Sequence, residues 1–209
     1  MKPESDTIYV DALLPLMEHF YTIQGEGYHS GKAAYFIRLG GCDVGCVWCD
    51  VKDSWDAVRF PKVSSEDLLK KVQDSGADRV VITGGEPLMY DLTELTAKLR
   101  KAGKKVHLET SGAYPLTGTW DWICVSPKKF KAPLESVLKR ADELKVIVFN
   151  NSDFEWALSH ADHVAVDCKL FLQPEYTSFS KMIAPIVQFA KKHTEWRISL
   201  QVHKIMNIP

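Results

Sequence analysis

The sequence predicts an α/β protein with a mainly parallel sheet and outer helices, because short apolar segments alternate with segments of helical periodicity. Apolar residues make up 45% of the 209 residues, which is enough for a sizeable core, and we expect residues 1–209 to form one domain. Polar motifs follow the predicted strands, where parallel sheets carry their chemistry. The alternation fits either an open barrel or a doubly wound fold.

The predicted elements follow one another from residue 34 onward. The first strand covers residues 34–39, and a helix at 64–75 begins after Ser64 or Ser65 as N-cap and ends at Gly76. A strand at 79–83 precedes a helical stripe of Leu92, Leu95, Leu99 and Ala102. The remaining predicted elements are strands at 106–110, 122–125, 144–149, 163–166 and 197–202, and helices at 134–141, 152–159 and 178–192.

Composition narrows the class of protein and its compartment. The formal net charge is −1 with scattered Lys and Arg, so no basic stripe indicates a nucleic-acid partner. No apolar run reaches membrane-spanning length, and the N-terminal segment MKPESDTIYVD lacks the apolar core of a signal peptide, so we expect a cytoplasmic protein. Five cysteines, three of them crowded together, form a poor disulfide framework and a good metal site in a reducing compartment.

Three cysteines within eight residues are the strongest chemical signal. Cys42, Cys46 and Cys49 follow a Gly-Gly turn with the spacing C-x3-C-x2-C, and no fourth protein ligand is evident nearby. Soft thiolates that converge on one centre with one position open suit an iron–sulfur cluster with one iron available to a small molecule. The alternatives are a zinc knuckle, which needs a fourth ligand, or a redox-active pair of Cys46 and Cys49. Cys124 and Cys168 lie far away in apolar segments.

Two further motifs follow predicted strands. In Gly84-Gly85-Glu86-Pro87 the glycines allow the backbone to approach a ligand closely, although a Gly-Gly pair alone is only a turn. In Ser126-Pro127-Lys128 the proline fixes the turn, and the hydroxyl and ammonium groups can reach ribose and carboxylate oxygens. The alternative for this second motif is an ordinary surface turn.

Together, the cysteine spacing, the GGEP element and the SPK segment resemble the radical S-adenosylmethionine superfamily. The resemblance implies a partial, open β/α barrel, and a [4Fe–4S] cluster held by Cys42, Cys46 and Cys49, with S-adenosylmethionine on the fourth iron. Electron transfer then cleaves the sulfonium to a 5′-deoxyadenosyl radical. The residues that the resemblance places around S-adenosylmethionine are Trp48, Asp50, Gly84, Gly85, Glu86, Glu109, Ser126, Pro127, Lys128 and Gln173.

Within that superfamily, residues 20–209 closely resemble the 7-carboxy-7-deazaguanine synthase family. The segments QGEG, FIRLGGC, GGEP, ETSG and SPK appear in the family's order, with His203 near the end and Pro209 last. The family contracts the ring of 6-carboxy-5,6,7,8-tetrahydropterin and releases ammonia, which gives 7-carboxy-7-deazaguanine, a precursor of queuosine. The resemblance also implies a homodimer and an electron donor such as flavodoxin.

The predicted pterin site consists of Ile23, Gln24, Gly25, Glu26, Arg38, Thr83, His203 and Pro209. Arg38 offers a planar fork for a carboxylate, although a surface salt bridge is the alternative. Gln24 both donates and accepts. Glu26 and Glu109 can accept from the pterin amino groups or the S-adenosylmethionine ammonium, and the alternative for either is to cap a neighbouring helix. The resemblance places the terminal carboxylate of Pro209 and the His203 ring against the pterin. A frayed tail is the alternative, but the last residues include apolar Ile205, Met206 and Ile208.

One position departs from the family pattern. Many members read Cys-Asp-Thr at the end of the cysteine loop, and the Thr hydroxyl ligates Mg²⁺ beside the substrate. Here Val51 follows Cys49-Asp50, and valine has no oxygen for a hard cation. The Mg²⁺ that the resemblance implies either binds through substrate oxygens, water and a residue such as Asp50, or is replaced in charge by a group such as Lys52.

Two other functions share part of these motifs. A radical-activating enzyme that makes a glycyl radical on a partner protein has the same cluster and GGEP element, but it needs an open face for the partner's loop. A zinc- or cluster-binding interaction module is the non-enzyme alternative, and metal analysis separates it from the enzymes.

Overall fold

The computed structural model describes residues 13–209, so the N-terminal segment used for the localisation prediction lies outside the described residues. Within this range one sheet has the order β3-β1-β2-β4-β5-β6-β7-β8-β9. Its strands are β1 (Leu14–Ile23), β2 (Ala33–Leu39), β3 (Lys62–Val63), β4 (Arg79–Gly84), β5 (Lys105–Thr110), β6 (Trp122–Val125), β7 (Glu143–Val148), β8 (Lys169–Pro174) and β9 (Trp196–Ile198).

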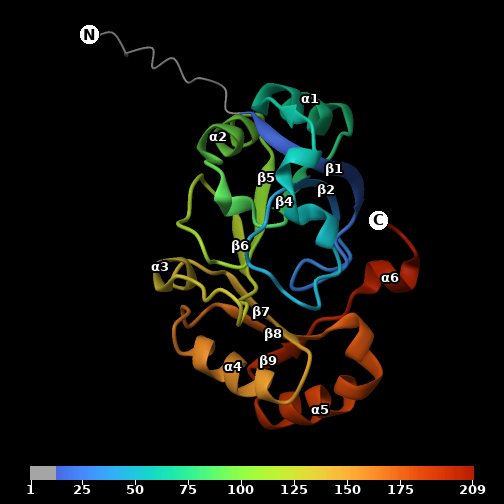
Figure 1. Ribbon diagram of the computed structural model, residues 1–209, viewed down its shortest axis with the longest axis vertical. Helices are drawn as coiled ribbons and strands as arrows, with labels where there is room; N and C mark the ends of the chain where they lie inside the picture. The colour runs from blue at the N-terminus through green and yellow to red at the C-terminus, as the bar shows by residue number, and fades with distance from the viewer. Residues whose placement is uncertain (1–12) are drawn as a thin grey trace.

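The sheet is parallel from β2 through β9, and β1 and β3 add an antiparallel edge. Because β3 and β9 are the two ends of the order and do not pair with each other, the curved sheet stays open (Figure 1). This arrangement is a partial β/α barrel, which confirms the predicted fold class and decides between the two architectures left open by the strand–helix alternation.

Helices cover the outer side of the sheet. Helices α1 and α2 pack against each other beside β5, whereas α4 and α5 pack on β7, β8 and β9 (Figure 1). The helical segments are α1 (Ser65–Asp74), α2 (Thr93–Lys101), α3 (Glu135–Leu138), α4 (Ser152–Ala161), α5 (Phe179–Lys192) and α6 (Val202–Met206), with 3₁₀ turns η1 (Lys52–Trp55), η2 (Ala57–Arg59), η3 (Pro87–Met89) and η4 (Tyr176–Ser178).

Local sequence explains where α1 begins and ends. The Ser64 side chain accepts a hydrogen bond from the Asp67 amide and caps the helix. Leu68 and Val72, four residues apart, are fully buried on one face. Gly76 then takes a positive φ of 71°, which lets the chain leave the helix at low cost.

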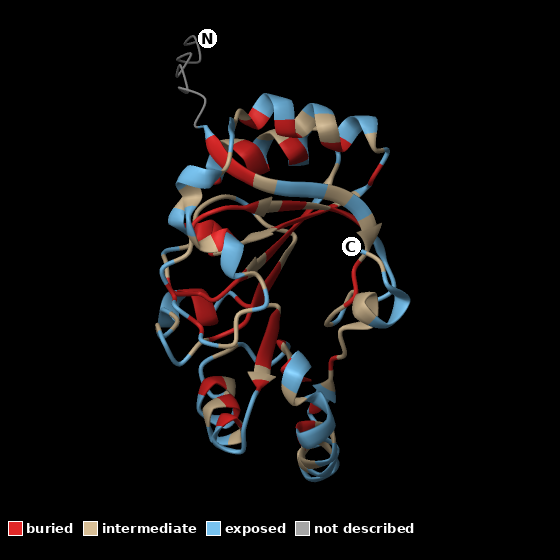
Figure 2. Ribbon diagram, turned by 45° about the vertical axis from the view of Figure 1, so that its right-hand side comes forward, coloured by how far each residue is buried: buried red, intermediate tan, exposed pale blue. Residues whose placement is uncertain are grey.

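Alternation along the strands separates the core from the concave face. Ile37, Ile82 and Leu108 pair in register across β2, β4 and β5, and all three are fully buried. Figure 2 shows these strands buried between more exposed outer helices. Since successive side chains of a strand point to opposite faces, Arg38, Thr83 and Glu109 point to the other side of the sheet.

The structure corrects two predicted strands and adds elements that were not predicted. Residues 163–166 form a turn, where Val166 is completely exposed, and the strand begins only at Lys169. The strand predicted at 197–202 ends at Ile198, and α6 begins four residues later. The prediction also missed β1, because this strand exposes several polar residues and lacks a clear alternation.

None of the helices between residues 13 and 209 combines the length and apolar character needed to cross a lipid bilayer.

Candidate active site

A cavity of about 290 Å³ lies on the concave face, where the parallel strands end. Its walls come from the end of β1, the cysteine loop, the ends of β2 and β4 through β8, and the C-terminal segment. The predicted residues in its lining are Ile23, Gln24, Gly25, Glu26, Arg38, Cys42, Cys46, Trp48, Cys49, Asp50, Thr83, Gly84, Gly85, Glu109, Ser126, Lys128, Gln173, His203 and Pro209. Glu86 and Pro127 are the predicted residues that do not line it.

The three cysteines are free thiols in one loop at the cavity wall. Burial raises the pKa of the Cys42 thiol and raises that of Cys46 to about 11, so metal binding has to displace their protons. Between residues 13 and 209, no three His, Cys, Asp or Glu side chains are grouped tightly enough for a single metal ion. The donor set is three thiolates from one loop that all line the same cavity, and three cysteines with one position left open suit an iron–sulfur cluster.

The glycine pair after β4 supports the base of the cysteine loop. The Gly85 amide donates to Leu39 O at 2.9 Å, and the Glu86 amide donates to Gly41 O at 2.8 Å. A Cβ atom at Gly85 would lie 2.3 Å from Gly41 O and 2.6 Å from the Cys42 Cβ. Only glycine allows this close approach of two backbones, so the turn holds the cysteine loop in place.

The Glu86 carboxylate is buried behind this turn rather than in the cavity. It accepts hydrogen bonds from the Thr110 hydroxyl at 2.6 Å, the Ser111 amide at 2.8 Å and the Leu88 amide at 3.0 Å. Glu86 thus ties the loop after β4 to the loop after β5. Its side chain organises the wall of the cavity from behind, which differs from the ligand contact that the family resemblance implied.

The segment after β6 contributes Ser126 and Lys128 to the lining. The Lys128 ammonium donates to the Ser126 hydroxyl at 2.6 Å and lies 5.3 Å from the centre of the Trp48 ring. Burial lowers the Lys128 pKa. Pro127 faces a separate shallow hollow with Phe130.

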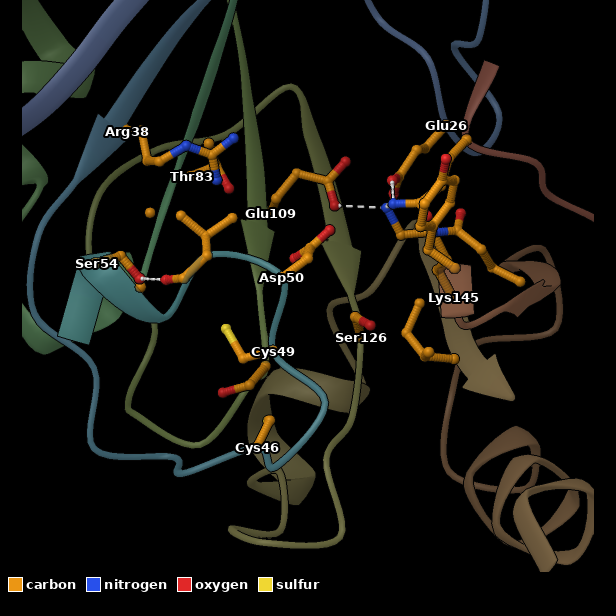
Figure 3. A pocket seen from close by; sticks show the side chains of 18 of the residues that line it. Glu26, Arg38, Cys46, Cys49, Asp50, Ser54, Thr83, Glu109, Ser126 and Lys145 are labelled. Atoms are coloured by element: carbon orange, nitrogen blue, oxygen red, sulfur yellow. Dashed lines mark hydrogen bonds and ion pairs between the residues drawn. The ribbon is translucent and has the colours of Figure 1, made fainter. Parts of the chain in front are cut away.

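Opposite the cysteines, Lys145 joins two carboxylates that the sequence analysis had singled out (Figure 3). Its ammonium lies 2.6 Å from Glu26 Oε2 and 2.9 Å from Glu109 Oε2. Burial alone would raise the Glu26 pKa, but the Lys145 charge and hydrogen bond lower it to about 2. Lys145 was not among the predicted site residues, although a single lysine within an apolar strand is a signal that could have revealed it.

Arg38 and Thr83 lie side by side in register on β2 and β4, and both line the cavity (Figure 3). The Arg38 Nε donates to Glu18 on β1 at 2.6 Å. The salt bridge considered as the alternative therefore exists, and it orients the guanidinium within the cavity wall.

The C-terminal segment is docked and not frayed. The Val202 amide donates to Gly25 O at 3.0 Å, and the Thr22 hydroxyl donates to Pro209 O at 3.3 Å. These contacts join the end of the chain to the loop after β1. His203 and Pro209 enter the cavity lining as a result, and burial lowers the His203 pKa.

Val51 lines the cavity at the position where the family pattern has threonine. The neighbouring Asp50 carboxylate is paired with Lys204 at 3.1 Å, and the Lys204 ammonium also lies 4.1 Å from the centre of the Tyr176 ring. Lys52, the predicted substitute for the ion's charge, is exposed on η1 and does not line the cavity. Lys204, and not Lys52, therefore places a positive charge beside Asp50.

Comparisons with known proteins agree with this geometry. The profile of the radical SAM superfamily matches residues 36–147, which run from within β2 to within β7 and include the cysteine loop. The 7-carboxy-7-deazaguanine synthase of Flavobacterium psychrophilum is 52% identical over 94% of this chain and 93% of the relative. That of a Synechocystis species is 43% identical over 100% of this chain and 99% of the relative.

A solved structure has the same fold. The crystal structure of QueE from Escherichia coli superposes with a TM-score of 0.81 at 34% identity, and the match covers 90% of this chain and 93% of that one. The cysteine loop, the open parallel sheet and these similarities agree, and the chain belongs to the radical SAM superfamily and, within it, to the 7-carboxy-7-deazaguanine synthase family.

Proposed function

We propose that this chain contracts the ring of 6-carboxy-5,6,7,8-tetrahydropterin to give 7-carboxy-7-deazaguanine and ammonia, in queuosine biosynthesis. One observation carries the proposal: a single cavity is lined at one end by the three cysteines and at the other by Gln24, Glu26, His203 and Pro209. A small polar heterocycle can therefore lie next to a bound cluster. The docked C-terminal segment favours this function over a glycyl-radical activase, which needs an open face for a partner's loop.

On the cofactor side, Cys42, Cys46 and Cys49 would hold the [4Fe–4S] cluster that the superfamily implies, and the turn at Gly84 and Gly85 would border S-adenosylmethionine. When bound, these groups supply the one-electron chemistry that removes a hydrogen atom from the substrate. The chain's own groups bind and orient the cofactor. The side chains for this role are Trp48, Asp50, Ser126, Lys128 and Gln173. Glu109, which the family resemblance placed with the cofactor, is assigned to the substrate in this proposal, because Lys145 joins it to Glu26.

On the substrate side, the charges in the cavity suit a carboxylated pterin. Glu26 and Glu109 accept from the donor edge of the pyrimidine ring, and Gln24 both donates and accepts. Arg38, oriented by Glu18, offers its fork to the substrate carboxylate. Ile23, Gly25, Thr83, His203 and Pro209 complete the pocket, which holds the substrate close to the cofactor and excludes water.

Magnesium has no place in this proposal, because the side chains present do not fit it. Val51 offers no oxygen, and the Asp50 carboxylate is already paired with the Lys204 ammonium. We infer that Lys204 provides the positive charge at this end of the cavity.

The remaining proposals concern partners and organisation. The superfamily needs a one-electron reductant, and a small carrier such as flavodoxin fits this need. The homodimer and the cytoplasmic location are proposed from the family resemblance and the composition. A single domain is supported by one continuous sheet and one cluster of buried apolar residues within residues 13–209.

The test is anaerobic turnover. Protein with a reconstituted cluster is mixed with reductant, S-adenosylmethionine and the carboxypterin, and the product is identified by mass spectrometry. We expect the deazapurine from the wild-type protein and none from Cys46→Ala. A cluster-loaded protein that cleaves S-adenosylmethionine but leaves the pterin unchanged would refute the function.

A further inference from the structure

We propose that Lys145 is a positioning residue that holds Glu26 and Glu109 as a matched pair of hydrogen-bond acceptors for the substrate. This inference rests on the proposed function. Lys145 lies on β7 and reaches the cavity between the loop after β1, which carries Glu26, and β5, which carries Glu109. Figure 3 shows the three side chains at the end of the cavity away from Cys46 and Cys49.

The hydrogen bonds hold both carboxylates in defined orientations. The Lys145 side chain is only 5% exposed, and it donates to one oxygen of each carboxylate. The other oxygen of Glu26 accepts from the Gln201 amide at 2.9 Å, and that of Glu109 accepts from the Gln24 amide at 3.3 Å. Each carboxylate oxygen has two lone pairs, so these contacts still leave acceptor capacity toward the cavity.

The charge on Lys145 decides the protonation state of the pair. Two carboxylates that share a poorly solvated site repel each other, and without a cation one of them keeps its proton near neutral pH. A protonated carboxyl donates a hydrogen bond and no longer matches a ring edge of N–H donors. With Lys145 present, the Glu26 pKa is about 2 and the pKa of Lys145 itself lies well above its ordinary value, so this pair stays charged.

Stability alone does not explain this arrangement. Replacing a buried ion pair by well-packed apolar groups is often neutral or stabilising, so a buried lysine is a poor device for strengthening a core. Here both partners of the lysine line the cavity; Glu26 belongs to the predicted pterin site, and Glu109 was predicted to accept from amino groups of the pterin or of S-adenosylmethionine. The other charged or titratable groups that interact with Lys145 are Cys124, Lys128, Glu143 and His203.

Substrate binding, measured without turnover, tests the inference. Cluster-loaded protein with S-adenosylmethionine and no reductant is titrated with the carboxypterin between pH about 6 and about 9. The wild-type dissociation constant should stay nearly constant over this range. In Lys145→Met and Lys145→Gln it should rise by about tenfold or more near pH 7 and fall again at higher pH, because the second carboxyl then ionises.

Three comparisons separate positioning from a merely structural role. Lys145→Arg keeps the charge and should retain the flat pH profile. Lys139→Gln, at an exposed lysine paired with Glu135 one turn away on α3, should behave as wild type. Iron content and affinity for S-adenosylmethionine should not change in Lys145→Gln.

Several results would overturn the inference. One is a Lys145→Gln protein that binds the pterin with wild-type affinity and pH profile. Another is a Lys145→Gln protein that loses affinity for the pterin and for S-adenosylmethionine equally. The last is a wild-type protein whose own affinity for the pterin increases steeply with pH over this range. The last measurement needs no variant, so a folding defect cannot prevent the test. A wild-type protein that does not bind the carboxypterin at any pH would instead refute the proposed function.

Discussion

Glu143 should make the protein less stable as the pH rises from mildly acidic to neutral, and Glu143→Gln should remove this effect. Glu143 begins β7 and is only 3% exposed. Its Oε2 accepts from the Tyr28 amide at 3.2 Å and the Trp122 indole at 3.1 Å. Its Oε1 is buried without a hydrogen-bond partner among residues 13–209. Burial is the main cause that raises its pKa from 4.5 to about 7, against the attraction of Lys145.

The sign and size of the effect follow from this pKa. The folded protein holds the Glu143 proton up to about pH 7, whereas the unfolded chain releases it near pH 4.5. The contribution of Glu143 to the folding free energy is therefore fully present below pH 4.5. It decreases as the pH rises from 4.5 to about 7, and it does not change further above about pH 7. The difference between 4.5 and about 7 corresponds to about 3 kcal/mol of lost folding free energy.

Urea unfolding of the wild type and of Glu143→Gln, each at about pH 5 and about pH 8, measures the effect. All other titratable groups are the same in the two proteins, so their effects cancel in the difference between the two unfolding free energies at each pH. This difference therefore reports on Glu143. That difference should shift in favour of the variant by about 2.5 kcal/mol between the two pH values, because a small part of the effect is already lost at about pH 5. Glu155→Gln on α4 is the matched control, because it removes a carboxylate from the exposed surface instead of from the interior. A Glu143→Gln difference that does not change with pH would refute the argument.

Three further predictions concern the cavity. Gly85→Ala should lower the iron content after reconstitution, because its Cβ would lie 2.3 Å from Gly41 O under the cysteine loop; normal iron loading would contradict this. Gly25→Ala should weaken pterin binding but not cluster assembly, since its Cβ would lie 2.7 Å from the backbone N of His203; titration of both ligands checks this. Turnover should be the same with and without added Mg²⁺, and Val51→Thr should make it respond to the ion; a wild-type enzyme that stops in Mg²⁺-free buffer would disprove the role inferred for Lys204.

The sequence predicted best what depends on neighbouring residues. The cysteine spacing, the glycine turn after β4 and the Ser-Pro-Lys segment are local patterns, and the structure brings their cavity-lining members together. The sequence was a poor guide to features that depend on which residues are exposed to solvent in the folded protein. The apolar residues at 163–166 predict a strand, but Val166 is exposed to solvent and the segment does not pair with the sheet. The Glu86 carboxylate was also predicted wrongly, because it accepts hydrogen bonds from Thr110 and Ser111. These contacts exist only because the sheet order places β4 beside β5.

Lys145 shows how far a stricter use of periodicity could have gone. The strand was predicted at residues 144–149, and Leu144, Val146 and Val148 are fully buried toward the helices. Alternation then requires Lys145 and Ile147 to face the concave side, where both line the cavity. A lysine on the inner face of a central strand must find anionic partners, since an unpaired buried ammonium is too costly. The sequence offered several acidic residues in loops and strand ends, and only the adjacency of β5, β6 and β7, together with the docking of the loop after β1, selects Glu26 and Glu109.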